Sequence, residues 1–159
     1  MSSFAQPGLK FNYSLYAAPA AWVIAMSPLW WATAVSSQAS PGAYNNAMPK
    51  ESWENLKGKV DDKLYGRVTR AIAANINSHT GLPFFAAGLV AGNVAHLDSS
   101  TLHYCAASYL ISRITYNLAY ILIEDPTWSF LRSALYWSGI VSTCTLFVKA
   151  ADRWKSLPW

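Results

Sequence analysis

Residues 15–36, LYAAPAAWVIAMSPLWWATAVS, form the first apolar run of the chain and contain no charged side chain. Their number is close to the ~20 residues that an α-helix needs to cross a bilayer. A cleaved signal peptide is the alternative interpretation, but its apolar region would be shorter and less aromatic. We therefore interpret this run as a retained membrane-spanning helix. Pro19 is expected in its first turn, and Pro28 is expected to kink it at mid-span.

Three more apolar runs follow, at residues 63–95, 101–123 and 128–151, and short links join them. The polar and charged residues 38–62 are expected to form one long loop between the first and second helices. The sequence thus predicts a single all-α domain over residues 1–159, a polytopic membrane bundle of four helices. Lysine and arginine are more frequent in this loop and at the start of the second helix than near the termini, so the positive-inside rule places the loop in the cytosol.

The amino-acid composition agrees with a membrane protein. Apolar residues make up 53% of the chain and charged residues only 13%, about half of the share found in soluble proteins. Several of the eight tryptophans lie near the ends of the apolar runs, as tryptophans do at membrane–water interfaces. A soluble helical bundle with a large aromatic core is the alternative that this composition disfavours.

Several functions are disfavoured by charge and spacing. The net charge of +4 comes from scattered residues that form no basic face, so no binding to nucleic acid is predicted. The histidines, His79, His96 and His103, lack the spacing of a metal site, and no metal is predicted. Cys105 and Cys144 both lie in apolar runs, where free thiols pack as small apolar groups, so neither a disulfide nor a nucleophile is predicted.

Polar side chains recur inside the apolar runs, where they are costly unless they pair or line a wet cavity. In the second helix Arg70 and Asn77 are seven residues apart and share one face. In the third helix Arg113, Tyr116 and Tyr120 also form a single stripe. These two stripes indicate a polar cluster within the membrane.

Arg132 and Ser133, near the start of the fourth helix, are expected to join this cluster. With almost no carboxylate nearby, Arg70, Arg113 and Arg132 would repel one another unless they converged on a shared anion. The alternative is that the arginines extend to lipid headgroups and that the tyrosines belong to the interfacial belt. This alternative explains Arg113 poorly, because that residue lies well inside the third helix.

These residues resemble the motifs of the superfamily of membrane-associated proteins in eicosanoid and glutathione metabolism (MAPEG). The resemblance covers residues 65–151. It rests on an arginine, an alanine, an asparagine and a proline in the second helix, on Arg-x-x-Tyr-x-x-x-Tyr in the third, and on Arg-Ser at the start of the fourth. The matching residues are Arg70, Ala74, Asn77 and Pro83, then Arg113, Tyr116 and Tyr120, then Arg132 and Ser133.

The resemblance implies a homotrimer in an internal membrane such as the endoplasmic reticulum, with glutathione held between subunits near the cytosolic face. A lipophilic substrate would arrive from the surrounding membrane lipids. The catalytic residues would be Arg132, which stabilises the glutathione thiolate, and Tyr120. The residues that bind glutathione would be Arg70, Asn77, Arg113, Tyr116, Tyr120 and Ser133. The expected activity is that of a glutathione transferase or isomerase.

Two positions depart from the family pattern. The family glutamate that pairs with the ammonium group of glutathione falls on Thr80, and a second arginine falls on Ala73. Glutathione is therefore expected to bind more weakly than in members that keep both, with His79 as a candidate substitute polar group. Two alternatives remain open on the same fold: a glutathione-independent isomerase or cyclase of a hydrophobic metabolite, and a non-catalytic lipid-presenting protein.

Overall fold

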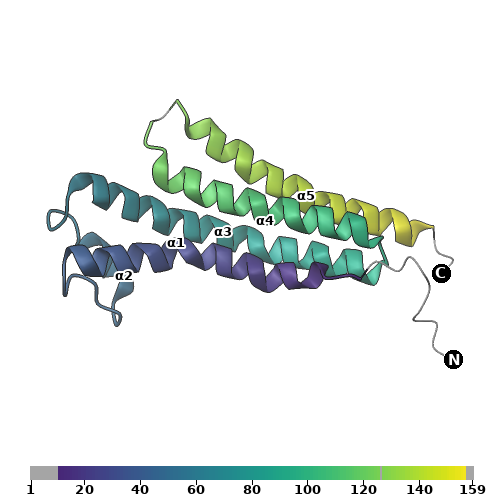
Figure 1. Ribbon diagram of the computed structural model, residues 1–159, viewed down its shortest axis with the longest axis horizontal. Helices are drawn as coiled ribbons and strands as arrows, with labels where there is room; N and C mark the ends of the chain where they lie inside the picture. The colour runs from purple at the N-terminus through teal and green to yellow at the C-terminus, as the bar shows by residue number, and fades with distance from the viewer. Residues whose placement is uncertain (1–10, 126, 157–159) are drawn as a thin grey trace.

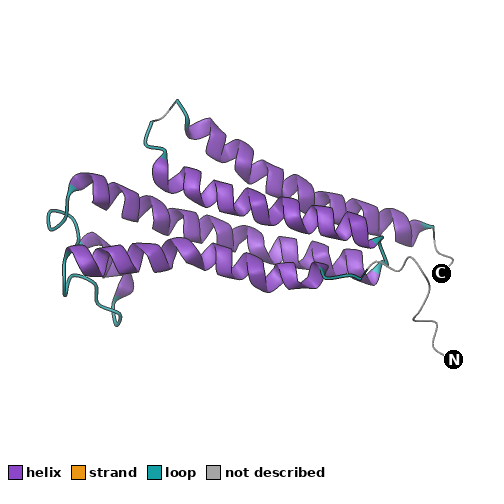
Figure 2. Cartoon of the chain, in the orientation of Figure 1, coloured by secondary structure: helices purple, strands orange, loops and turns teal. Residues whose placement is uncertain are grey.

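The computed structural model of the protein describes residues 11–125 and 127–156, and all regular secondary structure within them is helical. Lys10, one of the basic residues near the termini, and Pro126, in the link between the third and fourth apolar runs, lie outside the described residues. Four long helices are present (Figures 1 and 2). They are α1 (Ala17–Ala39), α3 (Asp62–Val94), α4 (Ser99–Leu122) and α5 (Ser129–Lys155). A single 3-10 turn, η1 (Ser14–Tyr16), precedes α1, and a short helix, α2 (Pro49–Glu54), lies in the long loop.

The four long helices lie side by side, with α3 and α4 at the centre (Figure 1). Helix α1 packs on α3 and α4 from one side, and α5 packs on them from the other. The loop that contains α2 and the link between α4 and α5 lie at one end of the bundle, hereafter the loop end (Figure 1). The start of α1, the link between α3 and α4, and the end of α5 lie at the opposite end (Figure 1).

The side chains of the bundle are distributed as in a membrane protein. Large apolar side chains are exposed along the helices, among them Ile76 on α3 and Leu118 on α4. Polar side chains are buried inside, among them Ser78, Ser112 and Asn117. Because α3 and α4 carry these polar residues, only the segments Ser14–Ala39 and Ser129–Lys155 in the described part of the chain are apolar enough to qualify as spans by length and composition.

The four predicted helices are present, and the long loop contains more structure than was predicted. Helix α1 continues to Ala39 rather than ending near residue 36, and α5 continues to Lys155 rather than residue 151. In the loop, Leu56 is fully buried and packs with Ala32 of α1 and Val68 of α3. Most other side chains of the loop are exposed, so it is a surface connection that folds locally and is anchored to this end of the bundle by a few buried residues.

The short link between α3 and α4 fixes their antiparallel arrangement. His96 adopts a left-handed conformation, with φ of 54°, which ends α3. Asp98 then begins α4, because its carboxylate accepts hydrogen bonds from the backbone N–H of Thr101 at 2.7 Å and from the hydroxyl of Thr101 at 2.8 Å. These two hydrogen bonds, the backbone one first, hold the pKa of Asp98 below its ordinary value.

Candidate functional site

A polar pocket of about 380 Å³ opens between α3, α4 and α5 near the loop end of the bundle. It brings together most of the residues that the sequence singled out as a site, and they come from all three helices. From this set the lining includes Asn77, Tyr116, Tyr120, Arg132 and Ser133. Thr80, Ser129, Tyr136 and Trp137 complete it.

Arg132 supplies the positive charge of the pocket. It lies in the first turn of α5, and its guanidinium carbon is 4.7 Å from the ring centre of Tyr120, a cation–π contact that fixes the group from one side. Within the described residues no carboxylate lies within ion-pair distance of Arg132; both ion pairs there involve Glu124 and other arginines. The guanidinium is therefore available to an anionic ligand.

Tyrosines and an asparagine form the inner wall of the pocket. Tyr116 is buried, with 3% of its surface exposed, and its hydroxyl oxygen accepts a hydrogen bond of 3.0 Å from the side-chain amide of Asn77. Its ring packs against those of Tyr120 and Tyr136, with centre distances of 5.4 and 5.8 Å. Because Asn77 occupies the oxygen as an acceptor, the phenolic proton of Tyr116 remains available for donation to a ligand.

Arg113 lies behind this wall rather than in the pocket. It is only 2% exposed, and its Nη2 donates to the backbone carbonyls of Leu135 at 3.1 Å and Tyr136 at 2.9 Å. The ring centres of Tyr116 and Tyr136 lie 4.9 and 4.8 Å from its guanidinium carbon. In this arrangement Arg113 joins α4 to α5 and holds the tyrosine wall in place.

Gly139 makes the position of Arg113 possible. A Cβ atom at residue 139 would lie 2.9 Å from Arg113 Nη2 and 2.6 Å from the hydroxyl oxygen of Ser112. Both distances are shorter than any relaxed contact, so a larger residue would push the guanidinium out of its place. The absence of a side chain at Gly139 is therefore required for the buried position of Arg113.

Arg70 also lies outside the pocket lining. Its Nε donates to the carbonyl of Ile121 at 3.1 Å, and its Nη2 donates to a carboxylate oxygen of Glu124 at 2.8 Å. The expectation that Arg70, Arg113 and Arg132 converge on one anion is therefore wrong for a single subunit. Each has its own surroundings, and the carboxylate of Glu124, in the link after α4, was overlooked as a partner.

Of the two positions that depart from the family pattern and the candidate substitute His79, only Thr80 lines the pocket. Thr80 lines the pocket, but its hydroxyl donates to the carbonyl of Ile76 at 3.0 Å. Ala73 and His79 are not among the lining residues. The imidazole Nδ1 of His79 lies 2.9 Å from the carbonyl oxygen of Asn75, so this ring is engaged within its own helix.

Ser129 and Trp137 also line the pocket and were not predicted as part of the polar cluster, whereas Tyr136, one turn after Arg132, was placed with the cluster but given no role. The signal that could have found them is the helical repeat around Arg132 and Ser133, because residues three or four positions away share a face of α5. The pocket then presents one guanidinium, several hydroxyls and one amide, with no carboxylate among its lining residues. Such a site favours a ligand with a negatively charged group.

Comparison with known proteins identifies the family. No curated protein and no solved structure matches the chain. The model of the MAPEG family does match it, over residues 15–152, which include all of α1, α3 and α4 and most of α5. The match therefore covers every residue of the pocket and most of the protein. The chain belongs to the MAPEG family of membrane proteins of eicosanoid and glutathione metabolism.

Proposed function

We propose that the protein is an integral membrane enzyme that stabilises the thiolate of glutathione at Arg132 and directs it to a lipophilic substrate. The observation that carries the proposal is the guanidinium of Arg132. It lies at a pocket without a carboxylate, it is stacked on Tyr120, and no ion pair within the described residues neutralises it. Family membership supplies the class of chemistry.

The proposed chemistry follows from the charge of Arg132. A cation beside a thiol in a site of low polarity favours the thiolate, which is the nucleophilic form. The thiol proton leaves to water at the mouth of the pocket. The thiolate then forms a carbon–sulfur bond with an electrophilic carbon of the substrate, and the electron pair passes to a leaving group or to an oxygen. The phenolic protons of Tyr116 and Tyr120 are placed to stabilise such an oxygen.

The pocket fits glutathione in part. Arg132 suits the thiolate, while the carbonyl oxygen of Asn77 and the hydroxyls of Ser129 and Ser133 suit the backbone of the tripeptide. No carboxylate lines the pocket to pair with the ammonium group. A neighbouring subunit of a trimer would have to supply further contacts, as the family arrangement implies.

A second candidate, an isomerase or cyclase that needs no thiol, is favoured by two observations. Thr80 lines the pocket at the position of the family glutamate, and Arg70 and Arg113 are engaged within the bundle instead of facing a ligand. In this reaction Arg132 and the tyrosine hydroxyls would hold negative charge that develops on a substrate oxygen. The two candidates share the pocket and differ in whether glutathione binds.

Calorimetric titration of glutathione into the protein in lipid nanodiscs tests the proposal. Glutathione should bind to the wild type, and Arg132→Ala should weaken binding by about tenfold or more, because a charge-assisted contact is lost. Arg153→Ala is the matched control, since this arginine lies in the last turn of the same helix and outside the pocket. Absence of binding to the wild type would favour the thiol-free candidate.

A further inference from the structure

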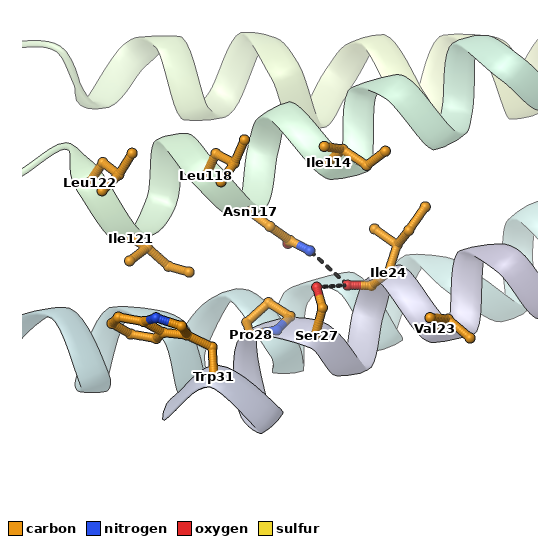
Figure 3. A pocket seen from close by; sticks show the side chains of 10 residues that line it. All are labelled: Val23, Ile24, Ser27, Pro28, Trp31, Ile114, Asn117, Leu118, Ile121 and Leu122. Carbon is orange, nitrogen blue, oxygen red and sulfur yellow. Dashed lines mark hydrogen bonds between the residues drawn. The ribbon is translucent and has the colours of Figure 1, made fainter. Parts of the chain in front are cut away.

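A second hollow, of about 410 Å³, lies between α1 and α4 (Figure 3). Its lining on α4 includes Ile114, Leu118 and Ile121, whereas the polar pocket uses Tyr116 and Tyr120 of the same helix. By helical spacing these two sets lie on nearly opposite faces of α4. The hollow is thus a separate feature, and what it holds does not depend on the proposed activity.

The hollow is elongated along the helices. It is lined on α1 by Val23, Ile24, Ser27, Pro28 and Trp31, and on α4 by Ile114, Asn117, Leu118, Ile121 and Leu122. Figure 3 shows the two stripes facing each other in the same order, from Ile24 opposite Ile114 to Trp31 opposite Ile121. Each stripe covers eight residue steps, or about 12 Å of helix. Small residues, Ser27 and Pro28, lie at the middle of the α1 stripe.

The polar groups in the hollow are engaged with one another. Pro28 has no N–H, so the carbonyl of Ile24 lacks its usual partner within the helix. The side-chain amide of Asn117 donates to this carbonyl at 2.9 Å, and the Ser27 hydroxyl donates to it at 2.8 Å (Figure 3). The side-chain oxygen of Asn117 accepts a hydrogen bond of 2.8 Å from Ser78. An occupant therefore meets hydrocarbon and needs no polar group of its own.

The hollow opens on an apolar surface. Around it Val23, Ile114, Leu118 and Leu122 are each between 45% and 58% exposed. A helix of a second subunit, about 10 Å wide, could lie over this hollow but could not fill it, because α1 and α4 are joined at its centre by the bond from Asn117 to Ile24. A single methylene chain is thin enough and lies in the direction of the helices.

We propose that the hollow between α1 and α4 holds an acyl chain of a membrane phospholipid, lying along both helices. The chain fills the space over Ser27 and Pro28, and its contacts are with the apolar side chains at either end of the stripes. This occupant is distinct from the lipids that surround any membrane protein, because it has a preformed site. It should remain bound longer and should be excluded by a side chain that fills the hollow.

Photo-crosslinking in nanodiscs tests this proposal. The probe is a phosphatidylcholine with a diazirine in one acyl chain, and adducts are mapped by proteolysis and mass spectrometry. Adducts on residues 23–31 and 114–122 should exceed those on the exposed Val90 and Val94 of α3, which line neither hollow, by about fivefold per residue. Ser27→Leu should lower the adducts in the hollow about fivefold, to the level of ordinary surrounding lipid.

Matched variants and a second probe make the test decisive. Ala34→Leu is the control, because Ala34 is exposed two turns beyond Ser27 on the same face of α1 and does not line the hollow. It should leave the labelling unchanged, whereas Leu118→Trp, which fills the hollow from α4, should lower it. Equal labelling of all exposed apolar positions, or labelling that Ser27→Leu does not change, would overturn the proposal.

Two further results would overturn the proposal of a phospholipid acyl chain, because they would indicate another occupant of the hollow. The first is labelling by a diazirine-bearing long-chain alcohol but not by the phospholipid, which would assign the hollow to a small lipophilic molecule. The second is a change in subunit number for Ser27→Leu by native mass spectrometry, which would assign it to a second copy of the chain.

Discussion

Arg113 and Arg132 carry the same guanidinium group but have different roles, because their surroundings differ. Arg113 is 2% exposed and donates to two carbonyls of α5, so its hydrogen-bonding capacity is directed inward. Arg132 is stacked on one ring and faces the pocket. The sequence placed both near a polar cluster, but spacing along one helix could not reveal that Gly139 of another helix leaves room for Arg113.

This difference predicts that replacement by alanine lowers the free energy of unfolding much more at Arg113 than at Arg132. Arg113→Ala should lower the free energy of unfolding by about 3 kcal/mol, because it leaves a cavity and two carbonyls without their side-chain donor. Arg132→Ala should change it by less than about 1 kcal/mol, because this partly exposed residue loses only its cation–π contact with Tyr120. Denaturant unfolding in detergent micelles measures both. Equal losses in the two variants would contradict the assigned roles.

The pH dependence of turnover separates the two candidate activities at Arg132. In the glutathione reaction, Arg132→Ala removes the charge that favours the thiolate and so raises the pKa of the bound thiol. The rate of the variant should fall about tenfold or more near neutral pH and recover in part as the pH rises. In the thiol-free reaction it should fall without recovery. Rate profiles of wild type and variant against a lipophilic electrophile, with and without glutathione, provide the measurement.

A wild-type rate that is indifferent to glutathione would rule out the glutathione reaction. The conservative variant Arg132→Lys serves as a control in the same profiles. It keeps the positive charge, so its thiol pKa should shift less than that of the alanine variant.

At the level of elements, the long helices could be predicted because apolar runs of sufficient length determine them. The short helix α2 could not, since its surroundings are stabilised by contacts distant in sequence, such as Leu56 with Ala32 and Val68. The same limit applies to the site. Asn77 and Tyr116 were predicted from spacing within single helices and Arg132 from its place at the start of the fourth helix. The partnership of Arg70 with Glu124 depends instead on how α3 meets the end of α4.

The start of α4 provides a prediction about stability and pH. The pKa of Asp98 is lowered in the folded protein, so its contribution is complete above the ordinary aspartate pKa and is lost as the pH falls through the lowered value. Asp98→Ala should therefore reduce the Tm at pH 7, and this deficit should shrink as the pH falls through the lowered pKa. Asp98→Asn can still accept the hydrogen bonds from Thr101 but carries no charge, so its Tm at pH 7 should lie between those of the wild type and Asp98→Ala. Thermal unfolding followed by circular dichroism checks both variants, and a deficit of Asp98→Ala that is the same at pH 7 and at low pH would contradict the contribution of the charge.

At the level of the whole molecule, family membership leads us to expect a homotrimer. The outer face of α3, with Thr80 and Ala87 exposed beside the apolar Ile76, mixes polar, small and apolar side chains, which suits contact with another subunit. Native mass spectrometry of the protein released from nanodiscs should give three times the mass of the 17.5 kDa chain. A monomer across several mild detergents would exclude the trimer.

Mixing inactive subunits tests how the trimer and the pocket are related. Asn77 and Arg132 line one pocket within a single chain, so each chain should need both of its own residues. Trimers that combine Asn77→Ala subunits with Arg132→Ala subunits should then be no more active than the mean of the two variants. If instead each site took Arg132 from one subunit and Asn77 from its neighbour, every cyclic trimer that contains both variants would have one complete site, which is about a third of its sites. Activity of co-expressed and doubly tagged trimers decides the matter, and recovery near that fraction would show that the pocket is built across subunits.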